Sequence, residues 1–555
     1  MQDSAPSSSS RLYSIPGTLD IISISETQCR IPAGGLCTAC IELNQVDKKI
    51  KEAAALLQQL IRQREELKTE RNCHHDQLIQ RLPTELVSRI FALCASYPPV
   101  SVDSMKVPPL YRQRKPLVSA PWELGVVSRS WRDVVYSTPQ LWTVISVNMS
   151  RRREAGYSEF VQEWLLRSGD LPLTLSLYTS ARSDTVPFEV LSTSEEPKAM
   201  QLLAAINQTS QRWRYLDVSL PVPFSGHLRG VSSGTSKLQS IHLGRPLGPR
   251  NTRSITFQMH VTPSPSRVAL EYIGFKAFDI NWDNVTHATI QSFSVAECLE
   301  MLRSAHQLTH FAVSYVYNDQ DPHESPSENL KIVHNHLQVC EVSSISRLDL
   351  LFSHLVLPSL INLHLFDNLS AAASLVSRSD CKITELSVNQ SETRLSSEED
   401  LITLLKLCPS LTHLTLLECP ISDIFFQELG HDKTPDQQQS TLSQFLPVLS
   451  SLSIEALLRF RWDSLTNMFN RHPDPLYAPR RKLRYLKVTI LEGERSESDE
   501  LSDESDDGVT EPLSRLIPKN VASSLLSLLD SEEVVIIIED EYKHSLLHTA
   551  LASEG

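Results

Sequence analysis

Glycine, basic charge and long apolar runs are all scarce in this chain. Only 16 of its 555 residues are glycine, and its formal net charge at pH 7 is −14. Scarce glycine disfavours the glycine-rich loops that cradle phosphates. A net negative chain lacks the basic surface that general nucleic-acid binding needs, and no apolar run approaches the roughly 20 residues that span a bilayer. We therefore expect neither a nucleic acid nor a membrane as a partner.

Sequence signatures of catalysis are also absent. The chain has no Walker lysine loop, no G-x-S-x-G nucleophile elbow, no H-E-x-x-H zinc motif and no Rossmann glycine pattern. We therefore expect no catalytic residue, no cofactor and no enzymatic activity.

The ten cysteines are scattered, and "MQDSAPSSSS" shows no basic region followed by an apolar stretch. With no export signal visible, we expect reduced thiols in a cytoplasmic or nuclear protein. Cys37 and Cys40 in "CTAC" have the spacing of half a zinc site. The other ligands would have to come from Cys29, or from Cys73, His74 and His75. That second half lacks C-x-x-C or H-x₃-H spacing, so we expect no metal.

Composition divides the chain into six segments. Residues 1–41 are rich in Ser, Gly, Pro and Thr, and 492–510 contain nine carboxylates and one arginine, so both are expected to be disordered. The other four predicted segments are an amphipathic helix or coiled coil at 42–80, a helical module at 81–147 with a Pro-rich insertion at 98–121, a solenoid at 148–491 and its C-terminal cap at 511–555.

In residues 42–80, mostly apolar side chains recur at alternating steps of four and three residues, which is the heptad spacing of a coiled coil. The positions are Val46, Ile50, Ala53, Leu57, Leu60, Arg64, Leu67, Arg71, His74 and Leu78. Two interpretations stay open. The helix either self-associates or docks as a coiled coil, or it is a long amphipathic helix that folds back on its own chain.

The stretch "RLPTELVSRIFALCASYP" (81–98) predicts a helix that is apolar over about 180° of its circumference. Pro83 suits the first helical position, where its missing N–H is not needed. A helix that packs on one core needs an apolar stripe of only about 100°. The part of the apolar arc beyond about 100° therefore predicts a second apolar contact for this helix. After the Pro-rich insertion, "PWELGVVSRSWRDVVYSTPQLWTVISV" predicts a second helix.

The two stretches together resemble an F-box, in the form common in large families of fungal proteins. The matching features are the Leu-Pro opening, Ile-Phe about two turns later in the same helix, and "WR" followed by "STPQLW". The Pro-rich insertion departs from the compact family pattern, and Ser128 stands where many members have cysteine. The resemblance implies a three-helix module that docks on a Skp-type adaptor, which in turn binds a cullin–RING ubiquitin ligase. The implied adaptor-binding residues are Leu82, Pro83, Leu86, Ile90, Phe91 and Trp131. The alternative is an ordinary buried helix in a larger all-α domain.

After about residue 150, a motif with the spacing apolar-x-x-apolar-x-apolar recurs. Copies lie at 213–218, 238–243, 270–275, 308–313, 360–365, 383–388, 411–416, 449–454 and 483–488, with less regular copies from 285 and 337. This resembles leucine-rich repeats, in which each unit adds one strand to a parallel sheet. The predicted fold class is therefore α/β, with a solenoid after the helical module. "VVIII" (534–538) is predicted as a strand of the cap. A non-repetitive α/β domain is the alternative.

The resemblance implies the substrate-recognition subunit of a Skp–cullin–F-box ubiquitin ligase, with the repeats holding an unknown target protein. A scaffold that is not linked to ubiquitination is one alternative, and an enzyme with an unrecognised site is another.

Overall fold

The structure is a computed structural model. It describes residues 11–12, 23–24, 37–75, 82–95, 120–179, 197–244, 257–316, 331–343, 348–390, 397–430, 445–467, 469, 483–491, 516–530, 534–547 and 549. The predicted acidic loop at 492–510, and most of segments 1–41 and 98–121, lie outside these residues. Within 1–41, β1 (Arg11–Leu12) and β2 (Ser23–Ile24) form a short antiparallel pair. The described residues divide into two compact units, one up to Leu141 and one from Trp142 onward.

The first unit is helical. Its helices are α1 (Thr38–His75), α3 (Thr84–Ala95), α4 (Ala120–Val127) and α5 (Arg129–Tyr136). The sequence predicted one helix where α4 and α5 lie, and that prediction is wrong. Ser128 has an extended backbone, and its side chain accepts a hydrogen bond from the Trp131 N–H, so it ends α4 and caps α5.

The second unit contains a 14-stranded sheet in which every neighbouring pair is parallel. Its strands are β3 (Val144–Asn148), β4 (Leu173–Tyr178), β5 (Trp213–Ser219), β6 (Ser240–Leu243), β7 (Arg267–Glu271), β8 (His287–Gln291), β9 (His310–Ser314), β11 (Val339–Ser343), β13 (Asn362–Phe366), β14 (Glu385–Asn389), β15 (His413–Leu417), β16 (Ser451–Ala456), β17 (Tyr485–Ile490) and β18 (Val535–Asp540). A separate parallel pair joins β10 (Ile332–Val333) to β12 (Leu355–Val356).

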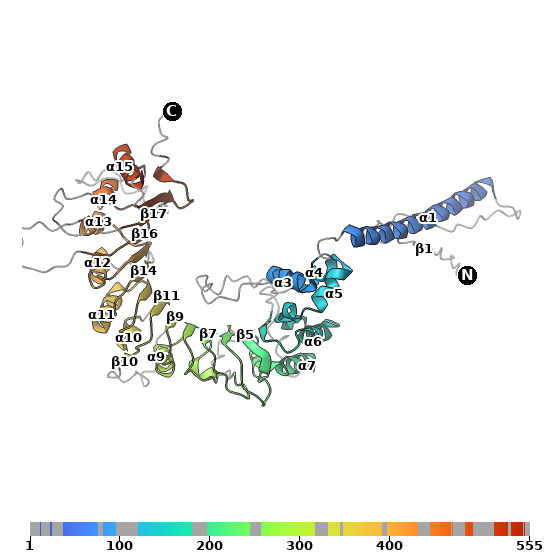
Figure 1. Ribbon diagram of the computed structural model, residues 1–555, viewed down its shortest axis with the longest axis horizontal. Helices are drawn as coiled ribbons and strands as arrows, with labels where there is room; N and C mark the ends of the chain where they lie inside the picture. The colour runs from blue at the N-terminus through green and yellow to red at the C-terminus, as the bar shows by residue number, and fades with distance from the viewer. Residues whose placement is uncertain are drawn as a thin grey trace, which may run out of the picture. The chain divides into compact units, whose positions relative to one another are not determined.

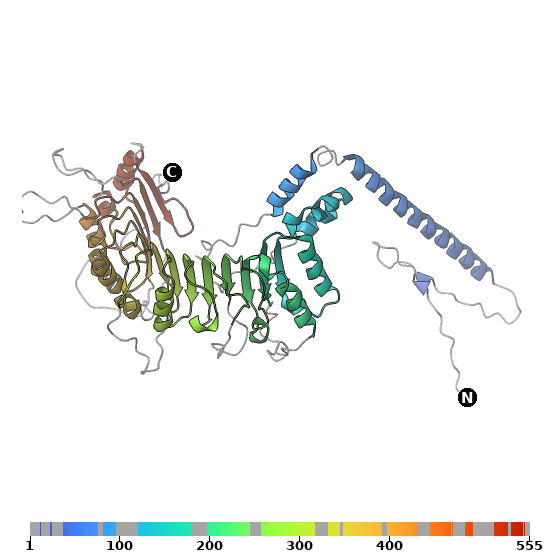
Figure 2. The same cartoon turned by 60° about the horizontal axis from the view of Figure 1, so that its bottom comes forward.

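Helices connect many of these strands and lie on the outer side of the curved sheet (Figures 1 and 2). They are α6 (Tyr157–Arg167), α7 (Pro197–Asn207), α8 (Val222–Ser225), α9 (Val295–Ser304), α10 (Leu348–Ser353), α11 (Leu369–Ser379), α12 (Glu398–Lys406), α13 (Asp423–Gly430), α14 (Trp462–Asn467) and α15 (Lys519–Asp530). Strand order follows chain order along the large sheet, so each unit packs mainly on its neighbours. This is a solenoid-like α/β fold.

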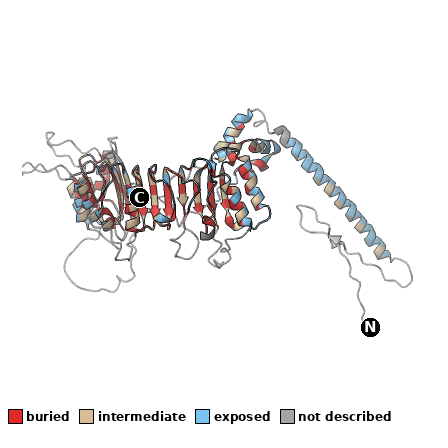
Figure 3. Ribbon diagram, turned by 90° about the horizontal axis from the view of Figure 1, so that it is seen from below, coloured by how far each residue is buried: buried red, intermediate tan, exposed pale blue. Residues whose placement is uncertain are grey.

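The repeated motif explains where the core lies. In one copy, Leu411 precedes β15 and is 0% exposed, while Leu414 and Leu416 on the strand are 1% and 0% exposed. Successive strand residues point to opposite faces, so Leu414 and Leu416 share the face that packs under the helices. The residues between them, such as Thr415, lie on the inner face. The same alternation of buried and partly exposed residues recurs in most strands of the large sheet (Figure 3), whereas β4, β7 and β17 bury three successive residues.

Two strand predictions need correction. The copy predicted at 270–275 is out of register, because β7 ends at Glu271 and the chain turns at Tyr272, whose φ is 58°. Its core residues are Val268 and Leu270 instead. The strand β4 was not predicted, although its sequence LTLSLY alternates leucine with other residues.

The predicted boundary between the helical module and the solenoid, 147/148, falls inside β3. That strand pairs in parallel with β4 as the first strand of the sheet. Trp142, just before it, is 0% exposed. Its ring lies 4.8 Å from that of Trp164 in an edge-to-face arrangement, and its carbonyl accepts a hydrogen bond from the Trp164 indole N–H at 2.9 Å. The sheet therefore begins earlier in the chain than residue 148.

Carboxylates link neighbouring repeat units. Glu398, in the first turn of α12, accepts hydrogen bonds from the backbone N–H groups of Ser422, at 2.8 Å, and Phe425, at 3.3 Å. It also accepts one from the Ser422 hydroxyl. These contacts satisfy N–H groups at the start of the next helix, α13, which have no partner inside that helix. The unit that contains α12 thus caps the helix of the unit that follows it.

We expect Glu398→Ala to destabilise the solenoid by about 1–2 kcal/mol, the usual cost of losing a helix cap. Chemical denaturation measures this loss. Glu399→Ala is the matched control, because Glu399 is an exposed neighbour on the same turn. Equal midpoints for the two variants would show that the cap contributes nothing.

Candidate protein-binding sites

The helix α3 begins at the predicted Leu-Pro opening. The Pro83 carbonyl accepts hydrogen bonds from the N–H groups of Leu86, at 2.9 Å, and Val87, at 3.2 Å, which closes the first turn. Glu85 in that turn is favourable beside the positive end of the helix dipole. The residues of the opening therefore form a fixed helical start.

The apolar residues of α3 divide into two faces. Val87 and Phe91 are each 1% exposed, and the Phe91 ring lies 4.7 Å from the ring of Trp131 on α5. Leu86, Ile90 and Leu93 are 47%, 42% and 70% exposed. At 3.6 residues per turn, these three side chains lie in one stripe along the helix. We call Leu86, Ile90 and Leu93 the outward stripe.

Polar contacts fix the orientation of α3 on its neighbours. The Thr138 hydroxyl donates its only proton to the Val134 carbonyl at 2.6 Å, so the Ser88 hydroxyl, 2.9 Å away, donates to Thr138. The Arg132 side chain donates to the Gly125 carbonyl at 2.9 Å and ties α5 to α4. The outward stripe therefore lies on a helix whose opposite side is fixed by packing and hydrogen bonds to the rest of the module.

The predicted site residues occupy different places. Pro83, Leu86 and Ile90 are exposed, whereas Leu82 and Trp131 are half-buried. Phe91 needs correction as a contact residue: its ring is inside the module against Trp131, so it positions α3 and offers no surface to a partner. Three exposed apolar residues were not among the predicted contacts: Leu93, Val126 at 72% and Val127 at 57% exposure. Leu93 lies within the predicted apolar arc, which was the available signal.

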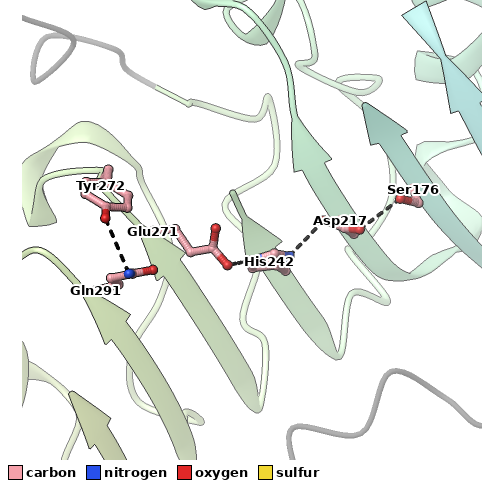
Figure 4. Close-up of polar contacts among 6 residues, drawn as sticks. All are labelled: Ser176, Asp217, His242, Glu271, Tyr272 and Gln291. Carbon is pink, nitrogen blue, oxygen red and sulfur yellow. Dashed lines mark hydrogen bonds and ion pairs between the residues drawn. The ribbon is translucent and has the colours of Figure 1, made fainter. Parts of the chain in front are cut away.

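The inner face of the sheet carries a chain of hydrogen-bonded polar side chains across four strands, of which one is buried and three are half-buried. Ser176 on β4 donates to Asp217 on β5 at 2.8 Å. His242 on β6 lies between two carboxylates, with Nδ1 2.8 Å from Asp217 and Nε2 3.0 Å from Glu271 on β7. Figure 4 shows these side chains following one another across neighbouring strands. We call these four residues the inner polar chain.

Electrostatics favour a charged imidazole in this chain. Burial lowers the pKa of His242, but Asp217 and Glu271 outweigh burial and raise the pKa of His242 to about 9. The arrangement is not a catalytic triad, because Ser176 bonds to Asp217 and not to His242. It joins adjacent strands and leaves one negative charge in excess on the inner face.

We expect the stability of the solenoid to fall with rising pH because of His242. Its pKa is raised from the ordinary 6.5 to about 9 on folding. Its contribution is therefore complete below about pH 6.5 and is lost as the pH rises through about 9. At ~1.4 kcal/mol for each tenfold change in proton affinity, the loss is on the order of 3 kcal/mol.

The measurement is the melting temperature as a function of pH, compared between the wild-type protein and His242→Gln. The variant should melt lower below pH 7, and the difference should shrink toward pH 9. His413→Gln, which removes an exposed imidazole from the same sheet face, is the control. A constant difference between wild type and His242→Gln at all pH values would contradict the charged imidazole.

Gln291 lies beside the inner polar chain and is 3% exposed. Its Nε2 donates to the Tyr272 hydroxyl at 3.4 Å, as Figure 4 shows. Its Oε1 has no hydrogen-bond partner among the described residues. Because this oxygen is buried, it is not accessible to a partner at the inner face.

In the part of the chain that the structure describes, no three His, Cys, Asp or Glu side chains are grouped as a metal site. Backbone geometry excludes the zinc site that would combine Cys40 with Cys73, His74 and His75. Because α1 runs unbroken from Thr38 to His75, a rise of 1.5 Å per residue separates Cys40 from Cys73 by roughly 50 Å. One copy of the helix cannot bring both around one ion, and Cys29 lies outside the described residues.

Among the described helices, none combines the length and apolar character needed to cross a bilayer.

Comparison with known protein families and with curated proteins finds no match for this chain. Among solved structures, the crystal structure of the Rad7 and Elc1 complex in yeast is similar, at 14% sequence identity and a TM-score of 0.23. The similarity covers 66% of this chain and 92% of that chain. A likeness of this size assigns no function, so function must be inferred from the geometry of the two surfaces.

Proposed function

We propose that this chain is the substrate-recognition subunit of a Skp–cullin–F-box ubiquitin ligase. The F-box is formed by α3, α4 and α5, and the leucine-rich-repeat-like solenoid holds the target protein. The outward stripe is the observation that carries the proposal. A short helix that is fully packed on one side and exposes three large apolar residues on the other has the form of half an interface.

The contacts of α3 support the following roles for its residues. Leu86, Ile90 and Leu93 meet the adaptor, together with Pro83 at the start of the helix. Phe91 and Trp131, whose ring centroids lie 4.7 Å apart, pack α3 on α5 and so fix the orientation of these residues. Leu82 and Pro83 set the first turn.

The solenoid supplies the second surface. Its inner face presents half-exposed polar side chains on strand after strand, and the helices cover the opposite face. Targets with donor groups suit the excess negative charge of the inner polar chain. The chain makes and breaks no bond. It acts by proximity, because holding target lysines near a charged ubiquitin-conjugating enzyme raises their effective concentration.

Affinity purification tests the assignment. The intact chain should co-purify a Skp-type adaptor and a cullin, and a chain lacking residues 81–141 should lose both. Adaptor without cullin would favour the scaffold that is not linked to ubiquitination. Neither protein with the intact chain would contradict the F-box assignment.

A further inference from the structure

The helix α1 exposes a mainly apolar stripe from Leu43 to Leu67. With the heptad frame that the sequence predicts, position a is Leu43, Ile50, Leu57, Arg64 and Arg71, and position d is Ala39, Val46, Ala53, Leu60 and Leu67. The large apolar residues among them are open, with Val46 51%, Leu60 51% and Leu67 57% exposed. Figure 3 shows the helix as mostly exposed. Within the described residues this stripe is uncovered.

We propose that α1 pairs with α1 of a second copy of this chain in an antiparallel two-stranded coiled coil centred near Ala55. In an antiparallel pair, each a position faces a d position of the other helix. When paired positions sum to 110, the facing pairs are Leu43 with Leu67, Val46 with Arg64, Ile50 with Leu60, and Ala53 with Leu57, and each pair occurs twice. The apolar stripe then meets itself over residues 43–67.

The charges select the antiparallel orientation. In a parallel pair, Arg64 would face Arg64 and Arg71 would face Arg71 inside the seam, and like charges that face each other repel. The antiparallel pair separates all four arginines. Each Arg64 then faces Val46 of the second copy, next to the carboxylate of Asp47. Glu42 and Glu70 become like-charged neighbours, but only at the two ends, where water screens them.

Side-chain size also favours this register. The centre of α1 reads "EAAALL", from Glu52 to Leu57. The antiparallel register sets small Ala53 against large Leu57, so the two helices interdigitate as a packed core does. A parallel pair would set Ala53 against Ala53 and leave a gap in the seam. Large and small residues of α1 therefore match when the helix pairs antiparallel with an identical helix. This match argues that the partner of α1 is a second copy of the chain.

Light scattering on the purified 555-residue chain tests self-association. We expect twice the 62.5 kDa mass of one chain. Leu60→Glu should give the mass of one chain, because it places a charge in the seam at a residue that is exposed in the single copy. Gln59→Glu, at an exposed position off the seam, is the matched control and should stay dimeric. A monomeric wild-type chain, or a dimer that survives Leu60→Glu, would overturn the proposal.

Crosslinking with a short bismaleimide tests the orientation, in a background with Cys37, Cys40 and Cys73 changed to serine. Ile50→Cys combined with Leu60→Cys should join two chains between residues 50 and 60, as identified by mass spectrometry of the crosslinked peptides. Leu60→Cys alone should give no crosslink at that position. Efficient joining of residue 60 to residue 60 would show a parallel pair and overturn the antiparallel register.

Discussion

Replacing Leu86 and Ile90 together by aspartate should weaken the binding of a Skp-type adaptor by at least 100-fold. Both side chains are exposed in the free chain, at 47% and 42%, so the substitutions leave the module's own core intact. In the complex they would bury unpaired charges where apolar anchors had been. Central interface anchors typically cost about 2–4 kcal/mol each when truncated, and every 1.4 kcal/mol is a tenfold change in affinity.

Thr84→Asp is the control for this double variant. It adds the same charge to the same helix at an exposed residue, about 160° around the helix from Leu86. Its adaptor affinity should stay within a few-fold of wild type. A thermal melt accompanies each titration, since a folded double variant that binds the adaptor normally would remove α3 from the interface.

A chain that begins at residue 150 should be less stable by more than ~4 kcal/mol than one that begins at Pro139. The shorter chain lacks β3, so β4 loses its parallel neighbour. It also lacks Trp142, which is 0% exposed and packs on Trp164. Removing a buried tryptophan side chain alone typically costs 3–5 kcal/mol, and the Trp164 indole N–H would lose its acceptor as well.

Thermal unfolding followed by circular dichroism compares the two truncated chains. The chain from Pro139 should unfold cooperatively, and the chain from residue 150 should unfold at a clearly lower temperature or aggregate. Coincident unfolding curves would mean that β3 and Trp142 add nothing to the solenoid. In that case the predicted boundary at 148 would be the practical one.

The periodicity of apolar residues predicted the parts of this fold in which the same spacing recurs from one strand to the next. The motif around Leu411, Leu414 and Leu416 recurs in most strands of the large sheet, because each strand buries the same two positions and the preceding turn buries a third. The helix predicted within 81–98 coincides with α3, because the apolar residues of this stretch recur with helical spacing. The copy predicted at 270–275 was wrong because residues 270–275 happen to match the motif as well. The strand lies earlier, and its buried residues are Val268 and Leu270.

Features that depend on distant neighbours could not be predicted in this way. Ile90 and Phe91 both belong to the apolar arc of α3, about 100° apart around the helix, and it is the contact with Trp131 on α5 that identifies the Phe91 side of the arc as the buried one. The inner polar chain joins His242 to residues 25 positions earlier and 29 positions later. No local pattern marks those partners, since the parallel register alone brings them together. Ser128 ended a helix through one side-chain hydrogen bond that competes with helical continuation.

Titration calorimetry of the purified chain with a purified Skp-type adaptor, followed by hydrogen exchange of the complex, tests the adaptor-binding role of α3 most directly. The account predicts saturable binding of one adaptor per chain and slowed exchange in α3, residues 84–95, with smaller changes in α4 and α5. No heat of binding, or protection confined to residues after 142, would contradict it.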